Sequence, residues 1–512
     1  MAGRAGLTRR NVLKAGGAGA LALGMGACAS EDFERDNARD ADAPNTLLLI
    51  TDSTRLDYIG SYNPGESRNE TPNIDALAKE SLRFDRAVPD CMPTGPVRRT
   101  VLSGVKGFPN RDWVPTPGLP ANPGWSAVPA DRPMFTELMG EAGINTSYCT
   151  DNPFLVGPRY ADFRRTLDFA RADYSQGFYR EFNKPWKRQA TRSEVEQFLL
   201  PALNDTVEVP RLQSYVGYNN LYRNGERMYS AARVMRSGMR VLDEFARGEQ
   251  PFFLGCDAFD PHEPFDPFKS YLVRFGDEPQ GVERDGITPI APFETPSNKV
   301  ETIDMDEETL ERVRELYAAE ITFVDKWIGR VLNKLDDLGM ADTTAVIYHS
   351  DHGITLGEHG IIGKAASRAH WHIYKVPFMI RDPERRRAGQ TTDYFASTQD
   401  VARTLLSYMG VRPTGEMDGE DLTVMFDGQD APARQYFTSM YEDYFIAGDE
   451  RYVLLSDSAG TERRLFDTAE DPGELNDIAA DNSQIVDRLW GALVTAGGGT
   501  LPVPNWGSVL GG

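Results

Sequence analysis

The sequence predicts an α/β fold in which helices flank a large mixed, mostly parallel central sheet. Short apolar runs of strand length alternate with segments of helical period as far as about residue 385. Ionisable residues follow three of the four clearest runs, and open α/β sheets place their sites at the carboxyl ends of strands. Beyond that point the pattern changes and predicts a small C-terminal α+β subdomain.

Four apolar runs make up the predicted centre of the sheet. They cover residues 46–51, 252–256, 345–348 and 376–380, and each has the length of a buried strand. The ionisable residues that follow the first three runs are Asp52, Asp257 with His262, and Asp351 with His352. We therefore expect these side chains to gather at one edge of the sheet.

One long helix is predicted on a face of this sheet. Apolar residues recur at spacings of three and four from Leu310 to Leu338, and Gly339 follows as a stop signal. Residues 109–133 are rich in Pro and Gly, which predicts an irregular loop near the mouth of the site. The elements predicted for the C-terminal subdomain are a helix near 398–409, strands near 435–455 and 463–467, and a terminal helix.

The composition is that of a globular protein with an excess of acidic groups. The chain of 512 residues is 40% hydrophobic and 26% charged, which excludes a disordered or fibrous protein. Its formal net charge of −22 argues against binding to nucleic acid through a global field. Four cysteines are too few for a disulfide scaffold.

The N-terminal segment is predicted to be a targeting signal rather than part of the fold. Arg9 and Arg10 precede a weakly apolar stretch that ends in small residues, so residues 1–29 resemble a twin-arginine export signal. The residues before Cys28 resemble a lipoprotein box, which makes Cys28 a candidate lipid anchor, although an ordinary signal peptidase could cleave here instead. Residues 30–44 are polar and read as a linker.

The histidines and their neighbours point to a metal site. All six histidines lie between residues 262 and 372. Asp351 and His352 are adjacent at a predicted strand end and can offer an oxygen and an imidazole nitrogen to one divalent cation. Lys364, a few residues further on, can meet a substrate oxyanion. His349 lies inside a predicted strand, where packing in the core is the simpler interpretation.

Several motifs together resemble the sulfatase family of the alkaline-phosphatase-like superfamily, over roughly residues 44–480. The segments that carry the resemblance are 49–57, 71–78, 260–265, 350–364 and 465–476. The resemblance implies a sulfatase-like catalytic domain over residues 45–385 and a C-terminal subdomain over residues 386–512. It also implies a metal-dependent ester hydrolase.

The nucleophile motif departs from the family pattern. That pattern is Cys or Ser-x-Pro-x-Arg, and the corresponding residues here are Thr94, Pro96 and Arg98. A register that begins at Cys91 would put Gly95 in the place of the Arg. A sulfatase proper oxidises its Cys or Ser to formylglycine, which Thr cannot become, so no formylglycine is expected. Members with Thr at this position resemble phosphodiesterases, phosphonate hydrolases and phospho-alcohol transferases, in which the hydroxyl itself forms the covalent intermediate.

Thr94 is predicted to be the N-cap of a helix that starts near Pro96. The free N–H groups of such a helix end can face the oxygens of a phosphate or sulfate group. Arg98, one turn further, can orient Thr94 or its adduct. The simpler alternatives are a capping threonine and an arginine on the helix surface.

The resemblance implies one divalent cation held by Asp52, Asp351, His352 and the Thr94 oxygen. A calcium site in this family carries more acids than this set. The histidine ligand and the single acid at the first strand favour manganese or zinc as the bound ion. The identity of the ion is not decided among calcium, manganese and zinc. A second metal would need further ligands, for which His262 and His370 are the candidates, and one metal is favoured.

The remaining roles also follow from the resemblance. His262 is the candidate acid that protonates the leaving alcohol, and Lys364 is the candidate group that holds an oxyanion. His370 and His372 belong to the same region as candidate substrate-binding residues, with packing as the alternative. The Lys- and His-containing string that follows residues 142–152 in arylsulfatase-like members is absent, which argues against sulfate specificity.

We therefore expect an exported hydrolase that cleaves sulfate, phosphodiester or phosphonate esters through Thr94. The expected partner is a small-molecule, glycan or lipid ester, with no nucleic acid and with membrane contact only through a lipid anchor. One alternative is a phospho-alcohol transferase acting on a cell-envelope glycan or lipid, although such enzymes usually carry several membrane spans. Another is a binding protein with a decayed site, against which the complete set of site residues argues.

Overall fold

Strand β1 (Asn45–Thr51) lies inside an eight-stranded sheet, because its residues are almost all buried and apolar or small. The other strands are β2 (Leu82–Phe84), β3 (Asn145–Thr150), β4 (Phe169–Ala172), β5 (Phe252–Ala258), β7 (Thr344–Ser350), β10 (Phe378–Arg381) and β11 (Thr391–Thr392). They are ordered β11-β2-β10-β7-β1-β5-β3-β4. Strand β10 runs antiparallel to both its neighbours, and the other neighbouring pairs are parallel. The predicted mixed, mostly parallel sheet is confirmed.

The computed structural model describes residues 43–65, 67–108, 124–126, 128–129, 131–156, 169–172, 190–196, 213, 215–217, 225–276, 299–302 and 305–501. The predicted export signal with Cys28, nearly all of the predicted linker and most of the predicted loop 109–133 lie outside these residues. The four predicted apolar runs all lie inside them and all form strands. The last begins at Phe378 rather than at Val376, because Pro377 has no N–H to offer to a strand ladder.

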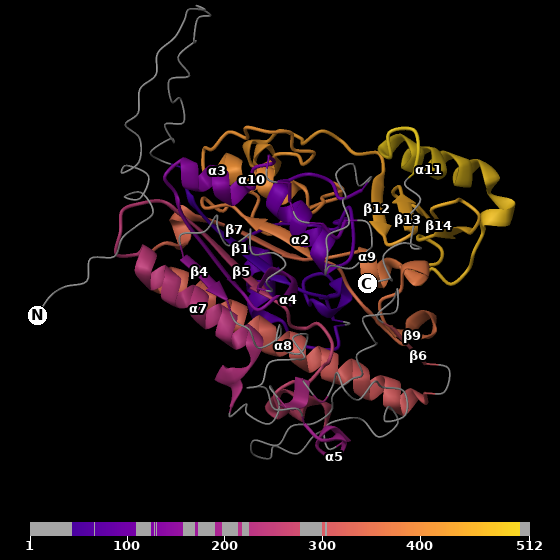
Figure 1. Ribbon diagram of the computed structural model, residues 1–512, viewed down its shortest axis with the longest axis horizontal. Helices are drawn as coiled ribbons and strands as arrows, with labels where there is room; N and C mark the ends of the chain where they lie inside the picture. The colour runs from indigo at the N-terminus through magenta and orange to yellow at the C-terminus, as the bar shows by residue number, and fades with distance from the viewer. Residues whose placement is uncertain are drawn as a thin grey trace, which may run out of the picture. The chain divides into compact units, whose positions relative to one another are not determined.

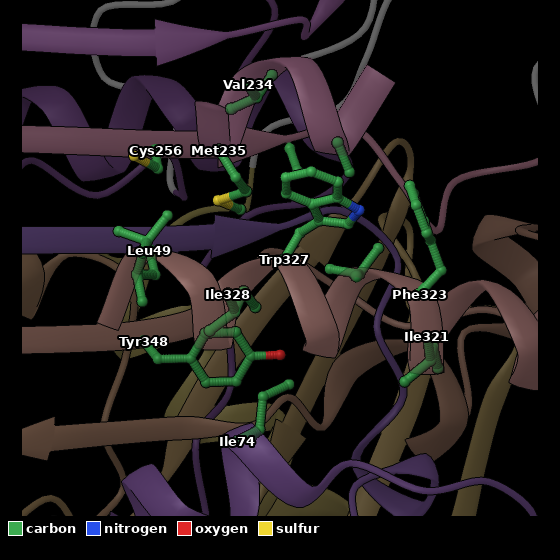
Figure 2. Close-up of a cluster of buried hydrophobic side chains, with 14 of the residues drawn as sticks. Leu49, Ile74, Val234, Met235, Cys256, Ile321, Phe323, Trp327, Ile328 and Tyr348 are labelled. Atoms are coloured by element: carbon green, nitrogen blue, oxygen red, sulfur yellow. The ribbon is translucent and has the colours of Figure 1, made fainter. Parts of the chain in front are cut away.

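The side chains of β1 alternate between two cores, one on each face of the sheet. Leu47 and Leu49 belong to a core with helices α1 (Pro72–Lys79), α7 (Ser230–Phe245) and α8 (Glu307–Asp337). Figure 2 shows part of this core, with Leu49 and Tyr348 on the sheet beside Trp327 and Ile328 of α8.

The opposite face of β1 carries Leu48 and Ile50. They pack in a second core with helices α2 (Thr94–Ser103), α3 (Phe135–Glu141) and α10 (Asp400–Tyr408). The sheet therefore lies between two layers of helices, with α7 and α8 on one side and α3, α10 and α2 on the other (Figure 1). Both faces of β1, β5 and β7 are covered, which is why their sequences are continuous apolar runs.

The long helix predicted from the apolar stripe is confirmed as α8. It spans 31 residues, and its side chain cap is Asp306, whose carboxylate accepts a hydrogen bond from the Thr309 N–H at 2.8 Å. It ends before Leu338, and Gly339 follows with φ 69°, a left-handed conformation that glycine adopts without steric cost.

The C-terminal elements form a second, antiparallel sheet. Its strands in order are β12 (Phe437–Tyr441), β13 (Tyr444–Gly448), β14 (Tyr452–Asp457) and β15 (Arg463–Asp467). One face packs against helix α11 (Ser483–Ala496), and the other contacts helix α9 (Trp371–Tyr374). The predicted helix, strands and terminal helix of this region are all present, and α10 itself packs against the main sheet.

The remaining described α-helices and strands are short. They are α4 (Pro153–Val156), α5 (Arg192–Glu196) and a three-stranded sheet of β6 (Lys299–Glu301), β9 (Ile361–Gly363) and β8 (Thr355–Leu356), in that order. Within the described part of the chain, no helix has the length and apolar character that a membrane span requires.

His349 gives the core of β7 a pH dependence. Its side chain is fully buried, its ring stacks on Phe378 with a centroid distance of 5.8 Å, and burial lowers its pKa to about 4. The unfolded chain takes up this proton near pH 6.5 whereas the folded chain resists it down to about 4, so the folded state loses stability as the pH falls through that window.

Replacing His349 with Phe is expected to make the free energy of unfolding less dependent on pH. Wild type should lose about 3 kcal/mol more than His349→Phe between pH 7 and pH 4. Chemical denaturation followed across this range measures the difference. Parallel stability curves for the two proteins would show that His349 does not titrate as its burial implies.

Candidate active site

Three carboxylates meet at the carboxyl ends of β1, β5 and β7. Asp52 and Asp351 directly follow β1 and β7, and Asp257 lies in β5, where its register partner on β1 is Ile50. The Asp52 N–H donates to the Ala258 carbonyl at 3.1 Å, and the Asp351 N–H donates to the Thr51 carbonyl at 3.3 Å. The strand ladder thus continues past the strand ends and holds the carboxylates, all fully buried, in one place.

Asp52, Asp351 and His352 form a group that fits a divalent cation. One ligand atom from each lies within 4.8 Å of the others, and no other such group of His, Cys, Asp or Glu occurs among the described residues. Asp52 Oδ2 is buried without a hydrogen-bond partner. An orphaned carboxylate oxygen beside a second carboxylate and an imidazole is the donor set that a metal ion satisfies. Three of the four predicted ligands are therefore brought together.

The two carboxylates of this group have opposite pKa shifts. Burial and the charge of Asp351 raise the pKa of Asp52 well above its usual range. Burial alone would raise the pKa of Asp351, but nearby charges, that of Arg98 first, and hydrogen bonds to the carboxylate together outweigh it, so this pKa lies below its usual range. Without a cation, the protein therefore favours one negative charge at this pair over two.

Thr94 is at the N-terminus of α2 and points at the same group. Its Oγ1 lies 3.2 Å from Nε2 of His352. The His352 Nδ1–H donates to the Gly353 carbonyl at 2.9 Å, so Nε2 is the unprotonated nitrogen and accepts from the Thr94 hydroxyl. Burial lowers the pKa of His352 to about 4, which keeps the imidazole neutral near pH 7.

The predicted capping role of Thr94 is wrong in detail. The helix begins at Thr94 itself, and Pro93 takes the N-cap position without a side-chain hydrogen bond. The reason is that the hydroxyl of Thr94 turns to His352 instead of back to the helix amides. The helix ends at Ser103, and Gly104 follows with φ 67°.

Cys91, the competing nucleophile, lies away from this group in an apolar core. Its side chain is fully buried and packs with Phe108, Met440 and Phe445, next to the C-terminal sheet. Burial raises the pKa of its thiol well above the usual value. Of the two alternative positions, the structure therefore brings Thr94 and not Cys91 to the carboxylates and the imidazole.

Arg98 is a buried residue that binds the carboxylates, not a residue of the helix surface. Its Nε and Nη2 donate to Asp257 at 3.1 and 2.6 Å, and its Nη1 donates to Asp351. Its Nη2 also lies 3.7 Å from Asp52 Oδ2. One planar guanidinium thus joins the ends of three strands. The structure shows Arg98 orienting the acids, whereas the sequence suggested that it orients Thr94.

Lys364 reaches the site from the segment after β9. Its Nζ lies 3.2 Å from Ser53 Oγ and 3.0 and 3.3 Å from the two carboxylate oxygens of Glu263. Ser53 Oγ in turn donates to Asp52 Oδ1 at 2.8 Å, and the Ser53 N–H donates to Asp351 Oδ1 at 2.9 Å. The positive charge of Lys364 is therefore close to the predicted metal ligands.

His262 lies on an aromatic wall next to the start of α2. Its ring stacks on Phe259 at 4.1 Å, and Phe259 packs with Trp125 and Phe154. Trp125 lies so close to Gly95 that a Cβ there would come within 2.3 Å of the indole, which explains glycine beside Thr94. The His262 Nδ1–H donates to the Glu263 carbonyl at 2.7 Å, so Nε2 is the nitrogen that can exchange a proton with a ligand.

His370 and His372 form a separate cluster with His359. The rings of His359 and His370 stack at 3.6 Å, and His370 Nδ1 lies 3.1 Å from a carboxylate oxygen of Glu474. Burial lowers the pKa of His359 to about 4 and of His372 to about 2. These side chains adjoin the C-terminal signature, and the contacts recorded in the described part of the chain do not link them to Thr94. His372 touches the site through its backbone, since its carbonyl leaves no room for a Cβ on Gly353.

Three residues that share this site were not assigned a role from the sequence: Ser53, Asp257 and Glu263. Each is adjacent or close to a residue that was assigned, and each is almost fully buried. Position next to a predicted ligand was the available signal. What could not be read from the sequence is that each also has a partner more than a hundred residues away, namely Asp351, Arg98 and Lys364 respectively.

A carboxylate and imidazole cluster at the ends of parallel strands, with a hydroxyl at a helix N-terminus beside it, suits the metal-assisted cleavage of an ester. The family model described as Sulfatase matches residues 44–411, and the model described as N-sulphoglucosamine sulphohydrolase, C-terminal, matches residues 357–496. The chain belongs to the sulfatase family, whose members depend on a metal and hydrolyse sulfuric and phosphoric esters, and it is a hydrolase of this class.

Two relatives and one solved structure illustrate what the chain is similar to. The multifunctional alkaline phosphatase superfamily protein PehA of Trinickia caryophylli is 26% identical, over 85% of this chain and 91% of its own length. An arylsulfatase of Clostridium perfringens is 24% identical, over 85% of this chain and 90% of its own. The solved phosphonate monoester hydrolase of Silicibacter pomeroyi has a TM-score of 0.65 at 20% identity, over 88% of this chain and 94% of its own, which supports the fold.

Proposed function

We propose that this chain is an exported, metal-dependent hydrolase that cleaves phosphodiester, phosphonate or sulfate esters through a covalent intermediate on Thr94. The observation that carries the proposal is the Thr94 hydroxyl, 3.2 Å from His352 Nε2 and beside the Asp52 and Asp351 carboxylates. A hydroxyl at a helix N-terminus, facing a cation site, is placed to attack a bound phosphoryl or sulfuryl group.

Asp52, Asp351, His352 and the Thr94 oxygen would hold one divalent cation. When bound, such an ion lowers the pKa of a coordinated hydroxyl and offsets charge on the transferring group. Calcium, manganese and zinc are all compatible with this donor set, and the imidazole favours the latter two. Formylglycine is not expected, because the Cβ of Thr94 carries a methyl group and its oxidation would give a ketone rather than an aldehyde.

The chain's own groups supply the remaining steps. Thr94 releases its proton to solvent and its oxygen bonds to phosphorus or sulfur as the bond to the ester oxygen breaks, and the leaving oxygen takes a proton from His262. Water then attacks the same phosphorus or sulfur and returns a proton to His262. The bond to Thr94 breaks and its oxygen takes a proton back from solvent. Lys364 lies beside Ser53 and close to the predicted metal ligands, where it can hold an oxygen of the transferring group.

A substrate panel tests this proposal. Nitrophenyl sulfate, a nitrophenyl phosphodiester, a nitrophenyl phosphonate monoester and nitrophenyl phosphate would each be offered to protein loaded with calcium, manganese or zinc. We expect turnover of the phosphodiester or phosphonate to exceed that of the sulfate, because the chain lacks a formylglycine precursor at position 94 and the sulfate-associated string. Absence of turnover for every ester by protein that has bound its metal would refute a hydrolytic role for this site.

We also propose that residues 1–29 direct export through the twin-arginine route, with Cys28 as a candidate lipid anchor. The natural substrate would then be a small-molecule, glycan or lipid ester met outside the cytoplasm. Fractionation of cells that express the full chain tests this directly. Replacing both Arg9 and Arg10 with Lys should retain the protein in the cytoplasm, and Cys28→Ala should release it from membranes. Export that persists in the double variant would exclude this route.

A further inference from the structure

Lys364 is neutralised before any substrate arrives. Its ammonium group contacts both carboxylate oxygens of Glu263, at 3.0 and 3.3 Å, and the side chains of Lys364 and Glu263 are 2% and 4% exposed. A buried ion pair of this kind is poorly screened by solvent. The positive charge that the sequence suggested for a substrate oxyanion is therefore already shared with a carboxylate.

The buried charged groups that contacts join to Asp52 and Asp351 carry more negative than positive charge. Four buried carboxylates, Asp52, Asp257, Asp351 and Glu263, face two buried cations, Arg98 and Lys364. Asp52, Asp257 and Asp351 surround Arg98, and Glu263 pairs with Lys364. A divalent cation would bring this set to balance, so a substrate group with two negative charges leaves twice the excess negative charge that a singly charged group leaves.

Building on the proposed function, we infer that Glu263 is a specificity-determining residue that selects ester groups with one negative charge over those with two. Sulfate monoesters, phosphodiesters and phosphonate monoesters carry one charge, whereas a phosphate monoester carries two at pH values well above about 6, its second pKa. An oxyanion that approaches Lys364 meets the Glu263 carboxylate as well. The second charge of a phosphate monoester is therefore repelled where the first is still accommodated.

The geometry also gives Glu263 a second contact, which the test must separate from charge selection. One carboxylate oxygen of Glu263 lies 3.4 Å from His262 Nδ1, and its backbone carbonyl accepts from the same nitrogen. If Glu263 only positioned His262 or Lys364, its replacement would lower the turnover of singly and doubly charged esters alike. Charge selection instead predicts a change in the ratio of the two.

The substitution Glu263→Gln removes the charge and keeps the shape. At about pH 8, where a phosphate monoester is doubly charged, kcat/KM would be measured for nitrophenyl phosphate and for the nitrophenyl phosphodiester. We expect the ratio of monoester to diester turnover to rise about tenfold or more in Glu263→Gln. Glu80→Gln is the matched control, since it makes the same change in net charge at a surface position that pairs with Arg381 and Arg385.

Binding provides a readout that does not depend on turnover. Calorimetry on metal-loaded protein, with and without Glu263→Gln in a Thr94→Ala background, would compare phenyl phosphate with phenyl sulfate. The substitution should tighten phenyl phosphate about tenfold relative to phenyl sulfate. An unchanged ratio in both measurements, or an equal loss for both ligands, would overturn the inference. If wild type turns over none of the esters, the proposed function fails, while the binding ratio still decides the role of Glu263.

Discussion

Thr94→Ala is expected to lower kcat/KM by about 10³-fold or more for every ester that the protein hydrolyses. The substitution removes the one hydroxyl that faces His352 Nε2, at 3.2 Å, and leaves the three predicted metal ligands in place. No other described hydroxyl combines a place at a helix N-terminus with this contact. Steady-state kinetics on the substrate panel measures the loss, and circular dichroism shows whether the fold is retained.

Two matched variants make the result specific to Thr94. Thr94→Ser keeps the hydroxyl and should retain substantial activity, because only the methyl group is lost. Cys91→Ala should be active at close to the wild-type level, because Cys91 is fully buried among apolar side chains. If Cys91→Ala were inactive and Thr94→Ala active, the assignment of the nucleophile would have to move to Cys91.

The fold was predictable to the extent that its patterns are local. Continuous apolar runs predicted the strands because β1, β5 and β7 are buried on both faces, and a stripe of period 3.6 predicted α8 because one face of it packs on the sheet. Short strands such as β2 and β11 have no comparable signal, since three or two residues do not establish a period. The order of the strands is likewise not encoded in any single segment.

The site was predictable where one residue type implies one chemistry. Asp52, Asp351 and His352 were found because each follows a strand, and the structure brings them together. The roles of Asp257 and Glu263 were missed because they are defined by partners far away in the chain, Arg98 and Lys364. An aspartate at a strand end or a glutamate beside a histidine is a common pattern, and only the buried ion pair shows what it does.

A tertiary contact explains why the N-cap of α2 was predicted at Thr94, one residue after its actual position at Pro93. A threonine before Gly-Pro is typical of an N-cap, where its oxygen would accept from the helix amides. Here the stronger partner is the unprotonated nitrogen of His352, which lies 258 residues further along the chain. Local propensity places the N-cap of α2 to within one residue, but the orientation of the Thr94 hydroxyl depends on a tertiary contact.

Asp52→Asn is expected to abolish metal binding without destabilising the metal-free protein. Burial and the charge of Asp351 raise the pKa of Asp52, so its ionised form costs folding free energy near pH 7 when no cation is present. Asparagine removes that charge, and its Oδ1 can still accept from Ser53 Oγ as Asp52 Oδ1 does at 2.8 Å. The metal-free variant should therefore unfold at the wild-type temperature or above it.

Adding metal should then separate the two proteins. A ligand that binds only the folded state at about 100 times its dissociation constant adds about 2.7 kcal/mol, so the wild-type Tm should rise with metal concentration. The Tm of Asp52→Asn should not respond, and elemental analysis should find the variant depleted of metal. Asp325→Asn provides a control at another buried carboxylate, which caps α1 through the Asn73 and Ile74 N–H groups and should leave the metal response intact. An equal rise in Tm for wild type and Asp52→Asn would show that the cation, if it binds, does so at a site other than the one formed by Asp52, Asp351 and His352.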